Sequence, residues 1–325
     1  MREGAALAAC ICAASVSAVG AAEPGAGKYP EKPIRVIVPF PPAGGVDVIA
    51  RLVGPALTEN LGRQLVIDNR GGASGNIGAE LAARAKPDGY TVMMHTLPFV
   101  TNTYLYRRVP YDVLKDFAPV SLMSSSPSML AVNPSVPARS VRELLELAKA
   151  RPGALNYATA GVGTNPHIAG ELLNYLGKVN IVAVHFKGGG PGMIATMGGE
   201  VGIITSIVPE IAQHVKTGRL RALGVTSSKR SAAVPDVPTI AESGLPDYEF
   251  TTWHGMLAPA GTPPAIVAVL NGKVAAAMKS PELARVLEDK GLEVIASSPD
   301  EFAAHLRSEL AKWGKVIRER NMHVE

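Results

Sequence analysis

The sequence predicts an α/β fold of two lobes, each with a mainly parallel, doubly wound β-sheet covered by helices on both faces. Short apolar strand patterns alternate with helix patterns along the chain, and this alternation is typical of parallel sheets. Two Pro-rich turns, at residues 133–137 and 258–264, interrupt the alternation. The 325 residues are enough for two lobes that each have a core.

The predicted strands are short and rich in apolar and β-branched residues. They occupy residues 34–38, 65–67, 91–95, 129–132, 155–158, 181–186, 201–205 and 222–226. Helix patterns fill most of the intervals between them. Because parallel neighbours need a long crossover connection, usually a helix, this order favours parallel pairing.

Three helices carry clear signals of their own. An apolar stripe follows Asp47 over residues 49–61, and Pro55 within it is predicted to kink that helix. Capping boxes begin at Ser140 and at Ser298. The second of these opens an amphipathic helix near the C-terminus.

The N-terminal segment differs from the rest of the chain because it consists almost entirely of small apolar residues. We interpret residues 1–22 as a secretory signal peptide with cleavage near Ala22, which predicts a periplasmic protein. Two alternatives remain open: an N-terminal membrane anchor, and a lipobox at residues 7–10 that would lipidate Cys10. Since Cys10 and Cys12 are the two cysteines of the chain, the mature protein would have no disulfide and no thiol chemistry.

The charge balance is mildly basic and excludes one class of partner. The chain has 32 Lys and Arg against 28 Asp and Glu, a formal net charge of +4, without a block of like charges. Aromatic residues make up only 5%, too few for base-stacking platforms. We therefore expect no nucleic-acid partner, and an anionic ligand is compatible with this charge.

The two Pro-rich turns are predicted to be the places where the chain changes lobe. Lobe 1 would then comprise residues 28–130 plus 250–325, and lobe 2 residues 131–249. Two passages between lobes make a hinge, and the cleft between the lobes is the expected ligand site.

Four Gly-rich loops each follow a predicted strand, two in each lobe. They span residues 41–47, 69–76, 159–165 and 187–192. A single such loop is often only a tight turn between a strand and a helix. Loops at the carboxyl ends of strands in both lobes would face one cleft, and their backbone N–H groups at helix N-termini favour a small anion.

Enzymatic motifs match less well. Residues 72–75 lack the second Gly of a nucleophile elbow because Asn76 stands there, although a hydrolase that uses Ser74 remains an alternative. Residues 161–166 are not a dinucleotide fingerprint, since Pro166 replaces the third Gly. The histidines lack metal-ligand spacing, so we expect neither a metal nor a cofactor.

Four further side chains each allow two interpretations. His167 could contact a carboxylate or could bond the backbone at a helix start. Lys187 could pair with an acid or could be solvated. For Trp253 and His254, packing is favoured over ligand contact.

Ordered motifs run along nearly the whole mature chain at compatible spacing. They are YPEKPIR at 29–35, VPFPPAGGVD at 38–47, NRGGASGNIG at 69–78, PDGYT at 87–91, PYD at 110–112, FKG at 186–188, GRLRAL at 218–223, PDVPT at 235–239 and APAGTP at 258–263. With these motifs the chain resembles the Bug-type periplasmic solute-binding proteins of tripartite tricarboxylate transporters.

This resemblance implies a periplasmic-binding-protein fold of the Venus-flytrap type (type II) that closes on a small organic acid. Such receptors hold carboxylates with backbone N–H groups, hydroxyls and water, and they deliver the ligand to integral-membrane permease subunits. The resemblance implies a receptor without catalytic activity, and we expect a monomer. A receptor that signals to a membrane histidine kinase is the alternative.

The chain departs from the family pattern at three places. Val46 stands where the family often has Ser or Thr, and Pro166 enters the helix start of the third loop. Thr205 and Ser206 stand where an aromatic residue and Asp are common, which predicts the loss of a carboxylate near the cleft. These departures favour a plain mono- or dicarboxylate, including aromatic acids, over an amino-dicarboxylate.

The candidate ligand-binding residues come from both lobes. They are Phe40, Ala43, Gly44, Gly45, Val46, Asp47 and Ser74 in lobe 1, and Gly161, Gly163, Thr164, Asn165, His167, Lys187 and Ser206 in lobe 2. Among them, we expect Asp47 to cap its helix and shape its loop.

Overall fold

The computed structural model describes residues 28–42, 44–319 and 322–323. The predicted signal peptide, both cysteines and Ala43 lie outside these residues. Within the described ranges, no helix is both long and apolar enough to cross a membrane.

The first lobe contains three parallel strands in the order β2-β1-β3, followed by β9, β4 and β10, which join in antiparallel pairs. Their bounds are β1 (Ile34–Val38), β2 (Leu65–Asn69), β3 (Thr91–His95), β4 (Phe117–Val132), β9 (Thr251–Pro259) and β10 (Glu293–Val294). Its helices are α1 (Gly45–Leu61), η2 (Ala73–Gly75), α2 (Asn76–Ala83), α3 (Pro98–Leu105), α8 (Pro264–Met278), α9 (Pro281–Asp289) and α10 (Pro299–Glu319).

The second lobe repeats this plan with the parallel strands β7-β5-β6, while β4 pairs antiparallel with β7 and with β8. The strand bounds are β5 (Asn156–Thr159), β6 (Val182–His185), β7 (Ile203–Ile207) and β8 (Arg221–Val225). The helices are α4 (Val141–Ala150), α5 (Asn165–Gly177), α6 (Gly189–Gly198) and α7 (Val208–Lys216).

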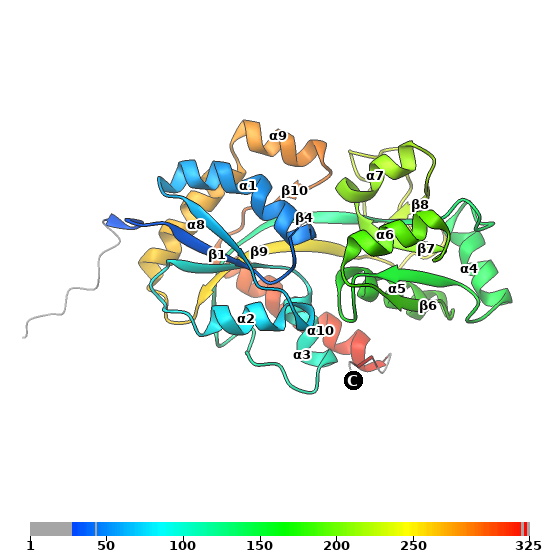
Figure 1. The fold of residues 1–325 in the computed structure, drawn as a ribbon, viewed down its shortest axis with the longest axis horizontal. Coiled ribbons are helices and arrows are strands. Elements are labelled where there is room, and N and C mark those ends of the chain that lie inside the picture. The colour runs from blue at the N-terminus through cyan, green and yellow to red at the C-terminus, as the bar shows by residue number, and fades with distance from the viewer. Residues whose placement is uncertain (1–27, 43, 320–321, 324–325) are drawn as a thin grey trace, which may run out of the picture.

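Strand β4 passes from one lobe to the other (Figure 1). Its register pairs Pro127 with Thr251 of β9, and the next residue, Ser128, with Ile207 of β7. The chain returns just before β9, where the Phe250 N–H donates to the Thr226 carbonyl at 2.9 Å. The passages therefore lie within β4 and at the start of β9.

The prediction that the Pro-rich turns mark these passages is wrong. The turn at residues 133–137 follows the end of β4 in the second lobe, and the turn at 258–264 lies at the far end of β9 in the first lobe. Both turns therefore lie at the outer ends of the crossing strands, away from the passages between the lobes.

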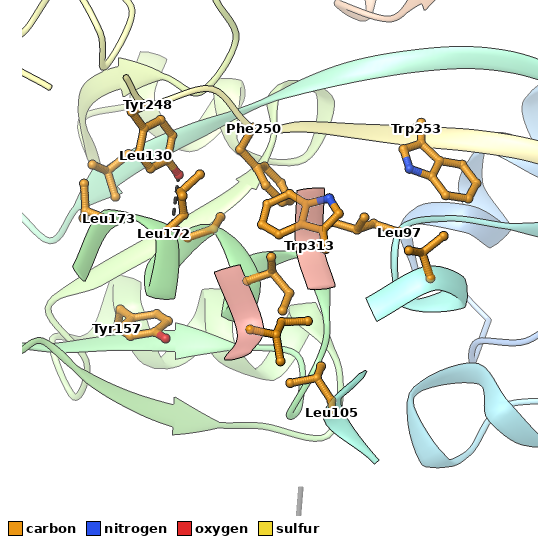
Figure 2. Close-up of a cluster of buried hydrophobic side chains, with 14 of the residues drawn as sticks. Leu97, Leu105, Leu130, Tyr157, Leu172, Leu173, Tyr248, Phe250, Trp253 and Trp313 are labelled. Carbon is orange, nitrogen blue, oxygen red and sulfur yellow. Dashed lines mark hydrogen bonds between the residues drawn. The ribbon is translucent and has the colours of Figure 1, made fainter. Parts of the chain in front are cut away.

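Helix α10 packs into an apolar cluster that both lobes share (Figure 2). Its Trp313 meets Phe250 edge-on with ring centroids 5.9 Å apart, and its Phe302 meets Trp253 at 5.8 Å. Leu172 and Leu173 of α5 belong to the same cluster. The C-terminal helix α10 therefore packs against residues of both lobes beside the crossing strands.

Candidate functional site

A cavity of about 830 Å³ lies between the lobes. All four Gly-rich loops line it, together with residues of the crossing strands β4 and β9. The helices α1, α5 and α6 begin at this cavity, so their N-terminal N–H groups and positive dipole ends surround one space. Apolar residues provide most of the remaining wall, which is typical of a small-molecule site.

Of the sequence-predicted site residues, ten line this cavity. They are Phe40, Gly44, Gly45, Val46, Ser74, Gly161, Thr164, Asn165, Lys187 and Ser206. Asp47, Gly163 and His167 do not line it, and Ala43 lies outside the described residues.

Asp47 shapes the first loop from behind. It is buried, receives a hydrogen bond from Asn69 Nδ2 at 2.9 Å and pairs with Arg51 at 2.9 Å. Asn69 Nδ2 also donates to the Phe40 carbonyl, which ties strand β2 to this loop. The helix begins after Gly44, and Asp47 lies in its first turn. These contacts show that Asp47 shapes the loop, and its role as a helix cap stays a prediction.

The buried ring of His95 packs against Phe40. The two rings meet edge-on with centroids 5.4 Å apart, and His95 Nδ1 accepts a hydrogen bond from the Thr96 N–H at 2.8 Å. Burial lowers the pKa of His95 to about 3, so the imidazole stays neutral near pH 7. A neutral ring is compatible with the apolar surroundings of Phe40.

The second loop carries Ser74 in a left-handed conformation with φ of 52°. Its hydroxyl donates to the carbonyl of Val162, in the other lobe, at 2.5 Å, and receives a hydrogen bond from the Tyr106 hydroxyl at 3.3 Å. Histidine is not among these partners, so this geometry does not show an activated serine nucleophile.

The third loop is held by its own hydrogen bonds. Thr164 Oγ1 donates to the Gly161 carbonyl at 2.6 Å, and the Gly163 N–H donates to His167 Nδ1 at 3.1 Å. Burial lowers the pKa of His167 to about 4, which keeps Nδ1 available as an acceptor. His167 therefore positions the loop, and the interpretation as a backbone-bonded histidine at a helix start holds.

The fourth loop brings Lys187 and the N-terminus of α6 to the cavity. Lys187 is exposed and forms no ion pair among the described residues. It is the basic residue among those that line the cavity.

The crossing strands supply a polar floor. Ser128 of β4 and Thr252 and His254 of β9 are buried and line the cavity. Because side chains alternate along a strand, Trp253 between them points into the core, as predicted. For His254, packing in preference to ligand contact stays a prediction: the residue is buried and its Nδ1 lies 3.3 Å from Ser124 Oγ, and it also lines the cavity. In the sequence, the alternation of polar Thr252 and His254 with apolar Trp253 is the pattern that could have indicated this polar part of the cavity.

Glu210 of α7 places a carboxyl group at the cavity. The sequence predicted that Ser206, in place of an acid, would leave the cleft without a carboxylate near this position, but Glu210 lines the cavity four residues later. Ser206 Oγ donates to Glu210 Oε2 at 2.5 Å. Burial raises the pKa of this carboxyl, and the Ser206 hydrogen bond opposes that effect.

Among the described residues, no group of three or more His, Cys, Asp or Glu side chains is arranged to hold a metal ion.

Comparison with known proteins agrees with this architecture. Residues 49–322 match the model of the tripartite tricarboxylate transporter family receptor. The chain is 35% identical to protein BugT of Bordetella pertussis over 94% of both chains.

Two solved structures extend the comparison. An R. palustris protein solved with adipate is 36% identical, with a TM-score of 0.86 over 91% of this chain and all of the other. MatC from Rhodopseudomonas palustris, solved with malate, is 32% identical, with a TM-score of 0.83 over 89% of this chain and all of the other. The chain belongs to the tripartite tricarboxylate transporter receptor family, whose Bug-type members are periplasmic binding proteins.

Proposed function

We propose that this protein is a periplasmic receptor that captures a small carboxylic acid between its lobes and delivers it to the integral-membrane permease subunits of a tripartite transporter. The ligand is a mono- or dicarboxylate, with aromatic acids included. The receptor is exported by the signal peptide at residues 1–22 and works as a monomer, without catalysis.

The observation that carries this proposal is the convergence of helix N-termini on one cavity between the lobes. The starts of α1, α5 and α6 bring unpaired backbone N–H groups to the same space. A carboxylate that accepts several such bonds in a site shielded from water needs no salt bridge. Family members that were solved with adipate and malate support an organic acid as the ligand class.

We assign ligand contact to the ten predicted residues that line the cavity. Gly45 and Val46 offer backbone N–H groups at α1, and Asn165 does the same at α5. The N–H groups of Gly44 and Thr164 donate to the carbonyls of Pro41 and Gly161, so these two residues shape the loops while they line the cavity. Asp47, Gly163 and His167 hold the loops that carry these groups. Residues 28–130 plus 250–325 and residues 131–249 are the lobes that move about the crossing strands.

Titration calorimetry with a panel of carboxylic acids tests this function. We expect at least one acid to bind with a stoichiometry of about one, and alkylamines or sugars of similar size not to bind. Delivery is tested by uptake of that acid into cells that carry the permease genes, with and without the receptor. A receptor that binds amines in preference to acids would contradict the proposal.

A further inference from the structure

We propose that Glu210 is a specificity-determining residue, which selects a carboxylic acid with a hydrogen-bond donor at its far end and rejects one with a second carboxylate there. The donor is a hydroxyl or an amine. This inference rests on the proposed function and narrows its ligand class.

Glu210 lies where the two lobes face each other. It belongs to the first turn of α7 in the second lobe. Opposite it is the first loop of the first lobe, since a Cβ on Gly45 would lie 3.7 Å from Glu210 Oε1. A ligand enclosed by these lobes would therefore lie against this carboxyl group.

The carboxyl group has one of its two oxygens engaged. Ser206 Oγ donates to Oε2, and this is the hydrogen bond that Glu210 forms among the described residues. A carboxylate has room for about four hydrogen bonds, and a buried polar group without partners is unfavourable. A donor on the ligand would satisfy Oε1, whereas a second carboxylate there would add like charge.

The cavity places its two charged side chains on different strands of the second lobe. Among the lining residues that the structure describes, Glu210 is the acidic one and Lys187 the basic one. Lys187 follows β6 and Glu210 follows β7, and β5 lies between these strands. Two strand spacings amount to about 10 Å. The cavity therefore has a basic side, with Lys187 and the starts of α5 and α6, and a separate side where Glu210 faces the start of α1.

This separation fixes the orientation of the ligand. Its carboxylate binds at the basic side, where N–H groups and Lys187 stabilise negative charge. Its other end then reaches the Glu210 side. An acid whose far end is neutral and has no hydrogen-bond donor would contact the apolar wall but would leave Glu210 Oε1 without a partner.

The test compares three acids with the same six-carbon chain: hexanoate, 6-hydroxyhexanoate and adipate. Their dissociation constants are measured by calorimetry with the wild type, with Glu210→Gln and with Glu282→Gln. Glu282 is a matched control because it is exposed in the first turn of α9, outside the cavity.

We expect the wild type and the Glu282→Gln control to bind 6-hydroxyhexanoate at least about tenfold more tightly than adipate. Gln at position 210 accepts from Ser206 and can donate to a carboxylate, so this ratio should fall to about one or reverse. Circular dichroism confirms that each variant is folded. If Glu210→Gln does not fold, the test uses the wild type and a Glu210→Asp variant instead. Both have a carboxyl group at this position, and both should prefer 6-hydroxyhexanoate to adipate.

A wild type that binds adipate as tightly as the hydroxy acid, or a ratio that Glu210→Gln leaves unchanged, would overturn the role of Glu210 while the receptor function stands. A folded wild type that binds none of the three acids, nor any other carboxylic acid, would overturn both.

Discussion

The hydroxyl of Ser74 in the first lobe donates a 2.5 Å hydrogen bond to the carbonyl oxygen of Val162 in the second lobe. Asn165 Nδ2 makes a second contact between the lobes, to Thr96 Oγ1 at 3.4 Å. All four residues line the cavity. The loops that line the cavity therefore also hold the lobes together. If the ligand binds there as proposed, ligand binding and closure depend on the same loops.

Replacement of Ser74 by Ala should weaken ligand binding through the closed state. The variant loses the bond to Val162 and leaves that carbonyl without this donor. A net loss of about 1 kcal/mol corresponds to roughly five- to tenfold weaker binding. Calorimetry measures the affinity, and small-angle scattering should show a more open apo protein. Ser308→Ala, at an exposed position of α10, is the control that should change neither.

Replacement of Gly163 by Ala should hinder closure of the lobes more strongly than Ser74→Ala does. Gly163 has a φ of 75°, where a side chain costs about 1–2 kcal/mol. The new Cβ would also lie 3.0 Å from Leu105 Cδ1 and 3.1 Å from Asn102 Oδ1, across the interface between the lobes. We expect the increase in melting temperature on ligand addition to shrink. Gly272→Ala in α8, where a Cβ meets nothing within 4 Å, should keep the full increase.

Buried histidines should make stability depend on pH. The pKa of His95 is lowered from 6.5 to about 3 by burial. Below pH 6.5 the unfolded chain binds a proton that the native protein does not, so stability is complete above that pH and declines towards pH 3. At pH 5 the loss is about 2 kcal/mol for this residue.

Urea unfolding at about pH 7.5 and pH 5 measures this loss. In a His95→Gln variant the difference between the two pH values should be smaller by about 2 kcal/mol. An unchanged difference would show that His95 is protonated in the native state.

Replacement of Gly255 by Ala should destabilise the fold at the crossing strands. A Cβ at this position of β9 would lie 2.1 Å from the ring of Phe302, which is fully buried. The ring or the strand must move, at a cost of about 3 kcal/mol in the free energy of unfolding. Chemical denaturation measures this cost. A Gly255→Ala, Phe302→Leu double variant should recover part of the stability, and failure to do so would contradict the proposed clash.

The parallel strands and the four Gly-rich loops could be predicted from the sequence because their signals are local. A run such as residues 34–38, followed by Pro and Gly, indicates a strand and then a ligand loop with little help from the rest of the chain. The structure places those loops around one cavity. The family motifs along the chain led to the same fold.

The crossing strands could not be predicted in this way. The first part of β4 is rich in Ser and Pro and lacks an apolar run, and its strand form depends on pairing with β9. Glu210 was missed for a related reason, since a carboxyl in an amphipathic helix looks solvent-exposed until the opposite lobe covers it. The contacts of His167 and His254 could not be predicted either, because they depend on residues that only the fold brings near them.

The most direct test of the account is mass spectrometry of the small molecules released when the purified mature protein is denatured. We predict a carboxylic acid in an amount close to that of the protein. Its amount should fall in Ser74→Ala and stay unchanged in Ser308→Ala. Release of a stoichiometric ligand that has no carboxylate would contradict the central claim that this cavity is built to hold an organic acid.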